Sequence, residues 1–150
     1  MGNIPLTPSD LPSKLEPMDD DGVYRGVIRD MVKNDEPNKS GRRYFKITSI
    51  EVLEPLKWKG RNTSDNHIEI PFSDENRPSF HEMNEFERAR EAERGIRLNN
   101  LCRAAKVEGI TIDSLAPENF VGKEIQFTIR NDEYPEGSEN YISKVDRYLF

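Results

Sequence analysis

The segment RRYFKITSIEVLE, residues 42–54, constrains the fold most strongly. It is rich in β-branched and aromatic residues, which favour strands. Its apolar positions change parity halfway along, with Phe45 and Ile47 on one parity and Ile50 and Val52 on the other. One extra residue would return both pairs to the same face, so we predict a β-bulge near Thr48–Ser49. Such a bulge lets a long strand bend around a small barrel.

Four other segments alternate in the same way, and we predict that each is a strand. They are residues 23–32, 67–72, 123–131 and 141–150. In the first of them, one face is expected to carry Tyr24, Gly26, Ile28 and Val32. The segments between the strands at 33–41, 55–66 and 132–140 are rich in turn-forming residues, so we expect loops there.

Residues 79–106 are predicted to be a helical region. SFHE at 79–82 has the form of a capping box, and Gly95 is expected to interrupt the helix. The part before Gly95 is charged nearly all round and is expected to project into water. The part after it has an apolar stripe at helical spacing, formed by Leu98, Leu101, Cys102 and Ala105. This stripe predicts packing against the sheet.

The order of these elements is three strands, a helical region and two strands. This is the chain order of the OB-fold, a five-stranded, partly open Greek-key barrel with a helix between its third and fourth strands. We therefore predict a mainly β fold of this type over residues 22–150. A strand-rich α+β sandwich is the alternative.

Residues 1–21 are expected to form an N-terminal arm, because prolines at positions 5, 8, 12 and 17 interrupt any helix. The arm is either a mobile tail or an extended segment that covers a sheet edge or a groove. It has no apolar block of the kind found in signal peptides. No apolar run in the sequence approaches the ~20 residues of a membrane span, so we predict no membrane association.

Positive charge is concentrated in one part of an acidic chain. The net charge is −6, yet residues 39–61 contain seven basic and two acidic residues, a local charge of +5. The remainder of the chain therefore carries −11. A ligand responds to the local field rather than to the average, so this segregation favours an anionic partner.

The sequence lacks the parts of familiar enzyme sites. It has two histidines, His67 and His81, and one cysteine, and none of them has zinc-ligand spacing. We interpret His67 as an exposed strand residue and Cys102 as a buried, inert thiol. No phosphate-binding glycine motif occurs, and the carboxylates of the helical region alternate with arginines. We therefore predict a protein without catalytic activity, cofactor or metal.

The basic segment also contains aromatic rings, the combination that single-stranded nucleic acid requires. Tyr44 lies between Arg42 and Lys46, and Trp58 lies between Lys57 and Lys59. The predicted nucleic-acid-binding residues are Arg25, Arg29, Lys39, Arg42, Tyr44, Lys46, Lys57, Trp58, Lys59 and Arg61, with Arg43 and Tyr134 as secondary candidates. We expect Arg25 and Arg29 on the strand beside the Arg42–Lys46 row. The alternative is that these are ordinary surface charges and that Trp58 packs against the rim of the barrel.

At these residues the chain resembles small phage-encoded single-stranded-DNA-binding proteins with an OB-fold. NKSGRRYFKITSIEVLEPLKWKGRN is similar to their segment KSG…(strand)…LE…(Y/W)KGR. RLNNLCRAAKV and the segment that begins FVGKEIQFTIRN also resemble theirs. By position, Lys39–Gly41 match the family's turn and Lys59–Arg61 match its second basic motif. The resemblance implies a role in phage DNA replication, recombination or repair, with single-stranded DNA and phage recombination or replication proteins as partners in the host cytoplasm.

Two other functions are compatible with the sequence. A protein-interaction module would use the charged helix 79–95 and the N-terminal arm as its contact surfaces. A nuclease or another enzyme would use the abundant carboxylates. The segment 73–95 is longer and more charged than in the phage family, and the loop 132–140 is acidic.

Overall fold

The computed structural model describes residues 7–10, 16–35, 42–72, 82–138 and 140–150. Its strands are β1 (Tyr24–Asn34), β2 (Arg43–Glu54), β3 (Asn62–Ile70), β4 (Glu124–Glu133) and β5 (Tyr141–Leu149). Two helices, α2 (Glu85–Arg94) and α3 (Ile96–Ala104), lie between β3 and β4. Short 3-10 helices occur at Pro8–Asp10, Leu56–Trp58 (η2), Ile112–Ser114 and Pro117–Asn119. The predicted mainly β class and the position of the helical insertion are confirmed.

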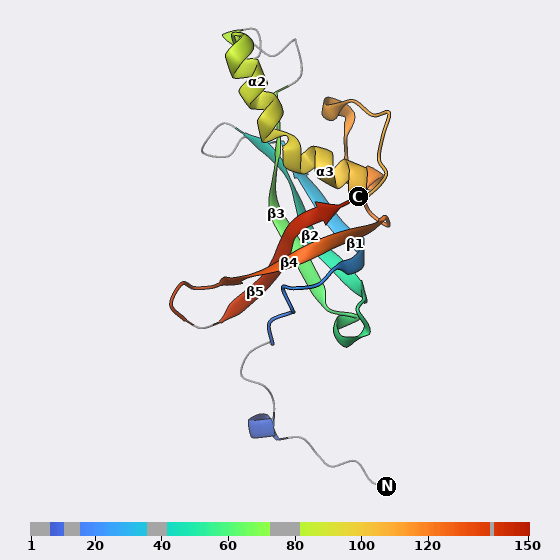
Figure 1. The fold of residues 1–150 in the computed structure, drawn as a ribbon, viewed down its shortest axis with the longest axis vertical. Coiled ribbons are helices and arrows are strands. Elements are labelled where there is room, and N and C mark those ends of the chain that lie inside the picture. The colour runs from blue at the N-terminus through green and yellow to red at the C-terminus, as the bar shows by residue number, and fades with distance from the viewer. Residues whose placement is uncertain (1–6, 11–15, 36–41, 73–81, 139) are drawn as a thin grey trace.

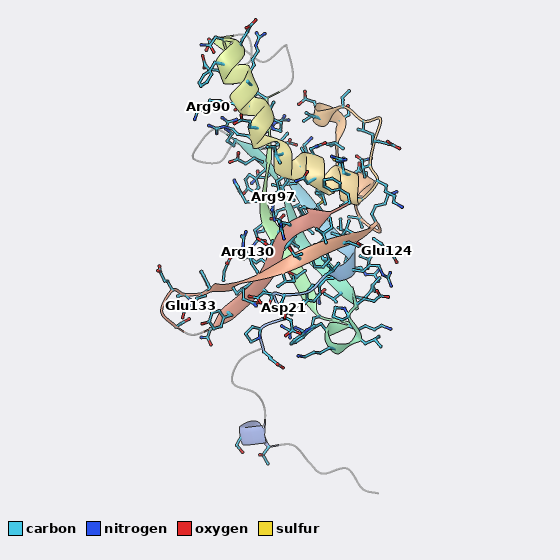
Figure 2. All side chains as sticks on the ribbon, viewed as in Figure 1. Asp21, Arg90, Arg97, Glu124, Arg130 and Glu133 are labelled. Carbon is cyan, nitrogen blue, oxygen red and sulfur yellow. The ribbon has the colours of Figure 1, made fainter. Side chains whose placement is uncertain are left out.

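The five strands close into a barrel with the neighbour order β1-β2-β3-β5-β4 (Figure 1). All neighbouring pairs are antiparallel except β3 and β5, which are parallel and share one registered pair, Ser64 with Lys144. Charged side chains such as Arg130 and Glu133 on β4 project from the outside of the strands (Figure 2). The apolar side chains of alternate positions fill the interior.

The predicted bulge in β2 is present. Phe45, Ile47, Ile50 and Val52 are all fully buried, so the apolar side chains before and after the change of parity all point into the barrel. The pairing of β2 with β3 shifts register between Ile47 and Ile50, which is where the extra residue was expected. A strand of this length can therefore contribute to the core at both of its ends.

The face of β1 was predicted only in part. Tyr24, Gly26 and Ile28 point inward, but Val32 is exposed and Met31 is buried in its place. The cause is a second irregularity, because the register of β1 against β2 shifts on both sides of Asp30. Beyond that point the inward parity of β1 is reversed.

The third strand begins five residues earlier than predicted, at Asn62 rather than at residue 67. Its first inward positions are Thr63 and Asp65, and both side chains are buried. Because these inward residues are polar, apolar alternation could not reveal this half of the strand.

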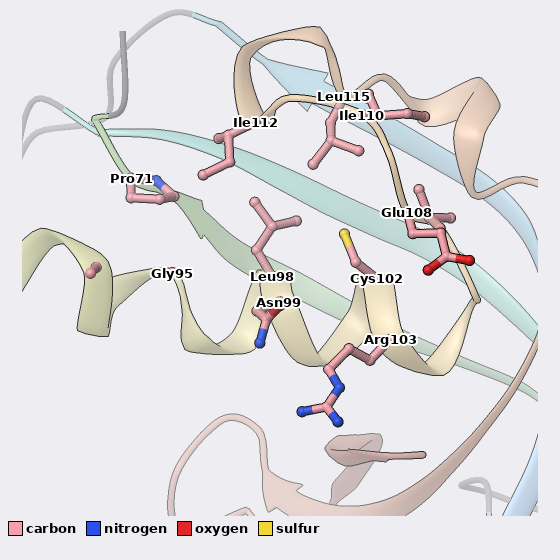
Figure 3. Close-up of a pocket in the computed structure, with 12 residues that line it drawn as sticks. Pro71, Gly95, Leu98, Asn99, Cys102, Arg103, Glu108, Ile110, Ile112 and Leu115 are labelled. Carbon is pink, nitrogen blue, oxygen red and sulfur yellow. The ribbon is translucent and has the colours of Figure 1, made fainter. Parts of the chain in front are cut away.

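The helical region breaks at Gly95, as predicted, and its two parts differ in environment. α3 packs on the barrel through Leu98, Leu101 and Ala105, whereas α2 extends away from it (Figure 1). The observed capping box is formed by Asn84 and Glu87. Three residues of the predicted box, 79–81, lie outside the described residues. Figure 3 shows Leu98 and Cys102 of α3 pointing toward Ile112 and Leu115 across a hollow.

Part of the arm packs against the barrel. Met18 is only 1% exposed and belongs to the hydrophobic core. Its backbone N–H donates to Ser143 Oγ at 3.0 Å, and its carbonyl accepts from Asn131 Nδ2 at 2.7 Å. The segment that precedes β1 is therefore attached to β4 and β5.

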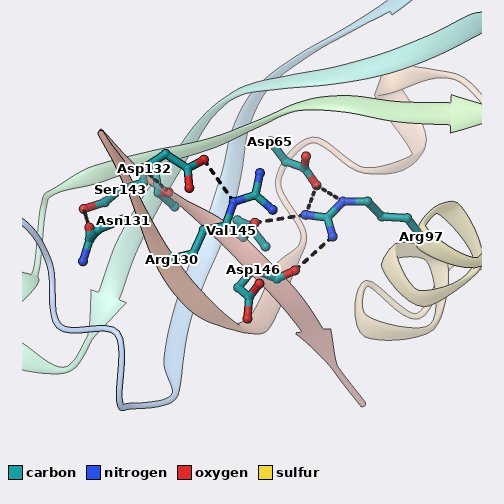
Figure 4. A network of polar contacts seen from close by, with 9 residues as sticks. Asp65, Arg97, Arg130, Asn131, Asp132, Ser143, Val145 and Asp146 are labelled. Atoms are coloured by element: carbon teal, nitrogen blue, oxygen red, sulfur yellow. Dashed lines mark hydrogen bonds and ion pairs between the residues drawn. The ribbon is translucent and has the colours of Figure 1, made fainter. Parts of the chain in front are cut away.

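Side chains complete the seam between β3 and β5, where the backbone ladder is short (Figure 4). Arg97 of α3 donates to the carbonyls of Val145 and Asp146 at 3.0 and 2.9 Å. It also donates to Asp65 Oδ2 at 2.8 Å, and the Tyr148 hydroxyl donates to the same oxygen at 2.6 Å. Burial, followed by the charge of Asp65, raises the pKa of Tyr148, so its hydroxyl remains a donor.

We predict that Arg97→Met lowers the free energy of unfolding by about 3–5 kcal/mol, because the buried Asp65 carboxylate loses its charged partner. Urea unfolding measures this change. Arg147→Met is the control, because Arg147 lies on the exposed side of β5 and its loss should change stability by about 0.5 kcal/mol or less. Equal losses from the two variants would contradict the role assigned to Arg97.

Candidate nucleic-acid interface

The predicted site residues do not form one continuous surface. Tyr44 lies at the start of β2, and Trp58 lies in the turn that follows its end. Ten residues separate Tyr44 from Glu54, which corresponds to about 33 Å of strand at ~3.3 Å per residue. The two ring-bearing groups therefore lie at opposite ends of the strand and do not form one binding surface.

Trp58 is a core residue rather than a stacking surface. Its side chain is only 4% exposed, and its Nε1–H donates to Asp19 Oδ2 at 2.9 Å. The hydrogen bond from Trp58 is the main cause that lowers the pKa of Asp19. The cationic groups of Lys57 and Arg61 lie 4.8 and 5.3 Å from the centre of the indole. A base has no access to this ring.

The cations around Trp58 are partly occupied by the arm. Lys57 Nζ lies 3.5 Å from Asp19 Oδ2, and Arg61 donates to the carbonyl of Glu16 at 2.9 Å. Lys59 is exposed and has no ion pair within the described part of the chain. At this end of the barrel, the Asp19 carboxylate and the Glu16 carbonyl therefore already occupy two of the basic side chains.

Arg25 and Arg29 lie on β1, the strand beside β2, as predicted, but they are not across from the Arg42–Lys46 row. The antiparallel register places Arg25 opposite Glu54, at the far end of β2. Arg25 forms ion pairs of 3.0 Å with both Glu54 and Glu124, and Arg29 lies 3.5 Å from Glu51. Both arginines are therefore neutralised on the barrel surface.

Arg42 and Arg43 hold other elements against the start of β2. The Arg42 side chain is 11% exposed, forms an ion pair with Glu91 of α2 and stacks on Phe72 with 4.8 Å to the ring centre. Arg43 donates to Asp113 at 2.8 Å. These contacts assign both arginines a structural role. Lys39 lies outside the described residues.

Two predicted residues remain on an accessible surface at the start of β2. The Tyr44 hydroxyl accepts from Asn34 Nδ2 at 2.7 Å, and the ring centre lies 5.0 Å from that of His67 on β3. Lys46 is exposed, and no ion pair involves it in the described part of the chain. Tyr44, His67 and Lys46 thus form a ring pair with a neighbouring cation on the outside of β2 and β3.

A polar hollow of about 240 Å³ adjoins this ring pair. Its lining residues are Asp65, Asn66, His67, Arg97, Arg130 and Lys144. Arg130 and Lys144 are direct cross-strand partners on β4 and β5. Like charges placed opposite each other destabilise a sheet, and Asp132, at 3.1 Å from Arg130, offsets only part of this cost. The pair has the charge that a bound phosphate would neutralise.

Sequence reasoning missed three residues of this surface: His67, Arg130 and Lys144. Each has the outward parity of a correctly predicted strand, so the pattern contains part of the signal. What it lacks is the cross-strand pairing that brings them together. The secondary candidate Tyr134 is exposed in the acidic loop after β4 and lies next to Glu133.

We refer to Tyr44, Lys46, His67, Arg130 and Lys144 as the groove. Its rings and cations can bind bases and phosphates, but it does not contain a nucleophile paired with a base. No group of three His, Cys, Asp or Glu side chains among the described residues could hold a metal.

A hollow beside α3 has a different character. It has a volume of about 450 Å³, lies between α3 and residues 107–115, and is lined mainly by apolar side chains. Cys102 faces it, and burial raises the pKa of this thiol, which makes it a poor nucleophile.

None of the helices in the described segments is long and apolar enough to cross a membrane.

A scan against protein-family models and a search of curated proteins both find no match to this chain.

We predict that Trp58→Ala destabilises the protein by about 3–5 kcal/mol, the usual cost of removing a large aromatic side chain from a core. Chemical denaturation followed by circular dichroism measures this loss. Leu56→Ala is the control, because Leu56 lies in the same turn and is exposed. A Trp58→Ala protein as stable as the control would contradict the core role of the indole.

Proposed function

We propose that this chain is a non-enzymatic single-stranded-DNA-binding protein with an OB-fold. The fold assignment is supported by the strand order β1-β2-β3-β5-β4 and by the helices between β3 and β4. OB-folds bind oligonucleotides on the face of strands 2 and 3 and on the adjoining loops. Three residues of the groove, Tyr44, Lys46 and His67, lie on β2 and β3, and Arg130 and Lys144 are contributed by β4 and β5.

The observation that carries the proposal is the Tyr44–His67 ring pair beside Lys46 and Lys144, which form no ion pair with the described residues. Binding of single strands combines a positive path for the backbone with rings on which bases stack. In the groove, Tyr44 and His67 would receive bases, while Lys46, Arg130 and Lys144 would receive phosphates. Every base has a ring face, so we expect little sequence preference.

The biological setting follows from the resemblance to phage single-stranded-DNA-binding proteins. We propose that the protein coats exposed DNA during phage replication, recombination or repair in the host cytoplasm. Replication or recombination proteins of the phage would be its partners. This setting rests on the segments NKSGRRYFKITSIEVLEPLKWKGRN and RLNNLCRAAKV rather than on the groove.

We predict that Tyr44→Ala weakens binding of a labelled oligothymidine by about 1–3 kcal/mol, the contribution of one stacked base. The slope of log K against log salt should stay unchanged, since no phosphate contact is lost. Fluorescence anisotropy over a range of salt concentrations measures both quantities. Matched thermal melts show whether the variant is folded.

The cations of the groove should behave in the opposite way. Combining Lys46→Gln and Lys144→Gln should make the salt slope shallower by about 1.4, at ~0.7 for each phosphate contact on a single strand. Lys59→Gln, at the other end of β2, is the matched control and should leave the slope unchanged. If oligothymidine shows no binding at low salt, the proposal is wrong and a protein-interaction module is favoured.

A further inference from the structure

α2 carries a ring and two arginines on one side. Phe86, Arg90 and Arg94 are spaced by four residues, and this spacing places neighbouring side chains along the same side of a helix. Arg97 follows in α3, after the break at Gly95. In Figure 2, Arg90, Arg97 and Arg130 succeed one another along the long axis of the molecule, from α2 to the barrel.

Two arginines of α2, Arg90 and Arg94, line a hollow of about 180 Å³ at the start of β2. Its lining residues are Arg42, Met83, Glu87, Arg90, Glu91 and Arg94. Both carboxylates have internal partners. Glu91 is bound by Arg42, by Arg94 at 3.7 Å and by the Phe72 backbone N–H at 2.9 Å, while Glu87 belongs to the capping box of α2.

Arg90 is consequently available to an external anion. It is exposed, and no ion pair joins it to a carboxylate in the described segments. Its guanidinium carbon lies 5.7 Å from the ring centre of Phe86, which is 70% exposed. An accessible ring next to an accessible cation is the arrangement that also characterises the groove.

Shared residues connect the two surfaces. Arg42 lines the hollow under α2 and is two residues from Tyr44 on the same strand segment. Tyr44 contacts His67, and His67 lines the polar hollow together with Arg97 and Arg130. A DNA strand bound in the groove would therefore reach α2 by passing Tyr44.

We infer that α2 is an extension of the single-stranded-DNA site, in which Phe86 stacks a base and Arg90 binds a phosphate. The inference rests on the proposed function. α2 has ten residues and is about 15 Å long at 1.5 Å per residue, so it adds room for further nucleotides beyond the groove. The affinity gained through α2 is then available to long oligonucleotides and not to short ones.

The test compares oligothymidines of about 5 and about 15 nucleotides, which span the usual range of OB-fold site sizes. Their affinities are measured by anisotropy for the wild type and for the Phe86→Ala/Arg90→Gln double variant. The double variant should bind the long strand at least about fivefold more weakly, since stacking alone contributes ~1 kcal/mol or more per base. Binding of the short strand should change by less than twofold. The salt slope for the long strand should become shallower by about 0.7.

Arg88→Gln is the matched control, because it removes the same charge from the same helix at a position about 200° around the axis from Arg90. It should leave the affinity for both strands unchanged. Circular dichroism melts verify that all variants are folded.

Equal effects of the double variant on both lengths, or no effect on either, would overturn the role of α2 while leaving the groove intact. An effect of Arg88→Gln as large as that of the double variant would overturn it too, since general helix charge would then explain the result. If the wild type binds neither strand at low salt, the proposed function fails and the inference fails with it. Tyr44→Ala separates these cases, because it should weaken both lengths.

Discussion

The barrel closes between β3 and β5 through the buried contacts of Arg97 with Asp65 and of Tyr148 with Asp65. These strands share one registered backbone pair, so Arg97, Asp65 and Tyr148 supply much of the closure. Arg97 comes from α3, so docking the helix and closing the barrel depend on the same buried contact. The polar hollow lies at this seam, and Arg97 and Asp65 form part of its wall. The fold and the candidate site are therefore stabilised by the same residues.

The clustering of basic residues in the sequence did not predict which basic side chains lack an acidic partner in the folded structure. Residues 39–61 are strongly basic, yet Arg42, Arg43 and Lys57 of this segment have acidic partners, as do Arg25 and Arg29 outside it. Three of these partners, Glu91, Asp113 and Glu124, are distant in sequence and reach the arginines through α2, the 3-10 helix at Ile112–Ser114 and β4. A chain with net charge −6 has enough carboxylates to neutralise most of such a segment. Of the groove lysines without an ion pair among the described residues, Lys46 was predicted from the sequence, whereas Lys144 was recognised only in the folded structure.

The core was the most predictable part of the molecule, because burial imposes a periodic pattern on the sequence. The parity change in β2 indicated its bulge, and the apolar stripe of α3 indicated its packing. The start of β3 was hidden because Thr63 and Asp65 point inward. In the groove, Tyr44 and Lys46 were identified from parity and composition. Arg130 and Lys144 were not, because no local pattern encodes which residues of β4 and β5 face each other.

The basic side chains at the two ends of β2 differ in their contacts, and this difference determines which end would bind an anionic ligand. At the Trp58 end, Asp19 already lies near Lys57 and accepts from the indole, and Met18 anchors this part of the arm in the core. An incoming phosphate would have to displace a carboxylate from a segment held by buried apolar contacts. At the Tyr44 end, Lys46 and Lys144 form no ion pair with the described residues, and the rings of Tyr44 and His67 lie beside them. A phosphate bound there would displace no ion pair of Lys46 or Lys144 with the described residues, and it would relieve the repulsion between Arg130 and Lys144. For the proposed DNA ligand, the Tyr44 end is therefore the favoured site, although the basic residues around Trp58 are equally prominent in the sequence.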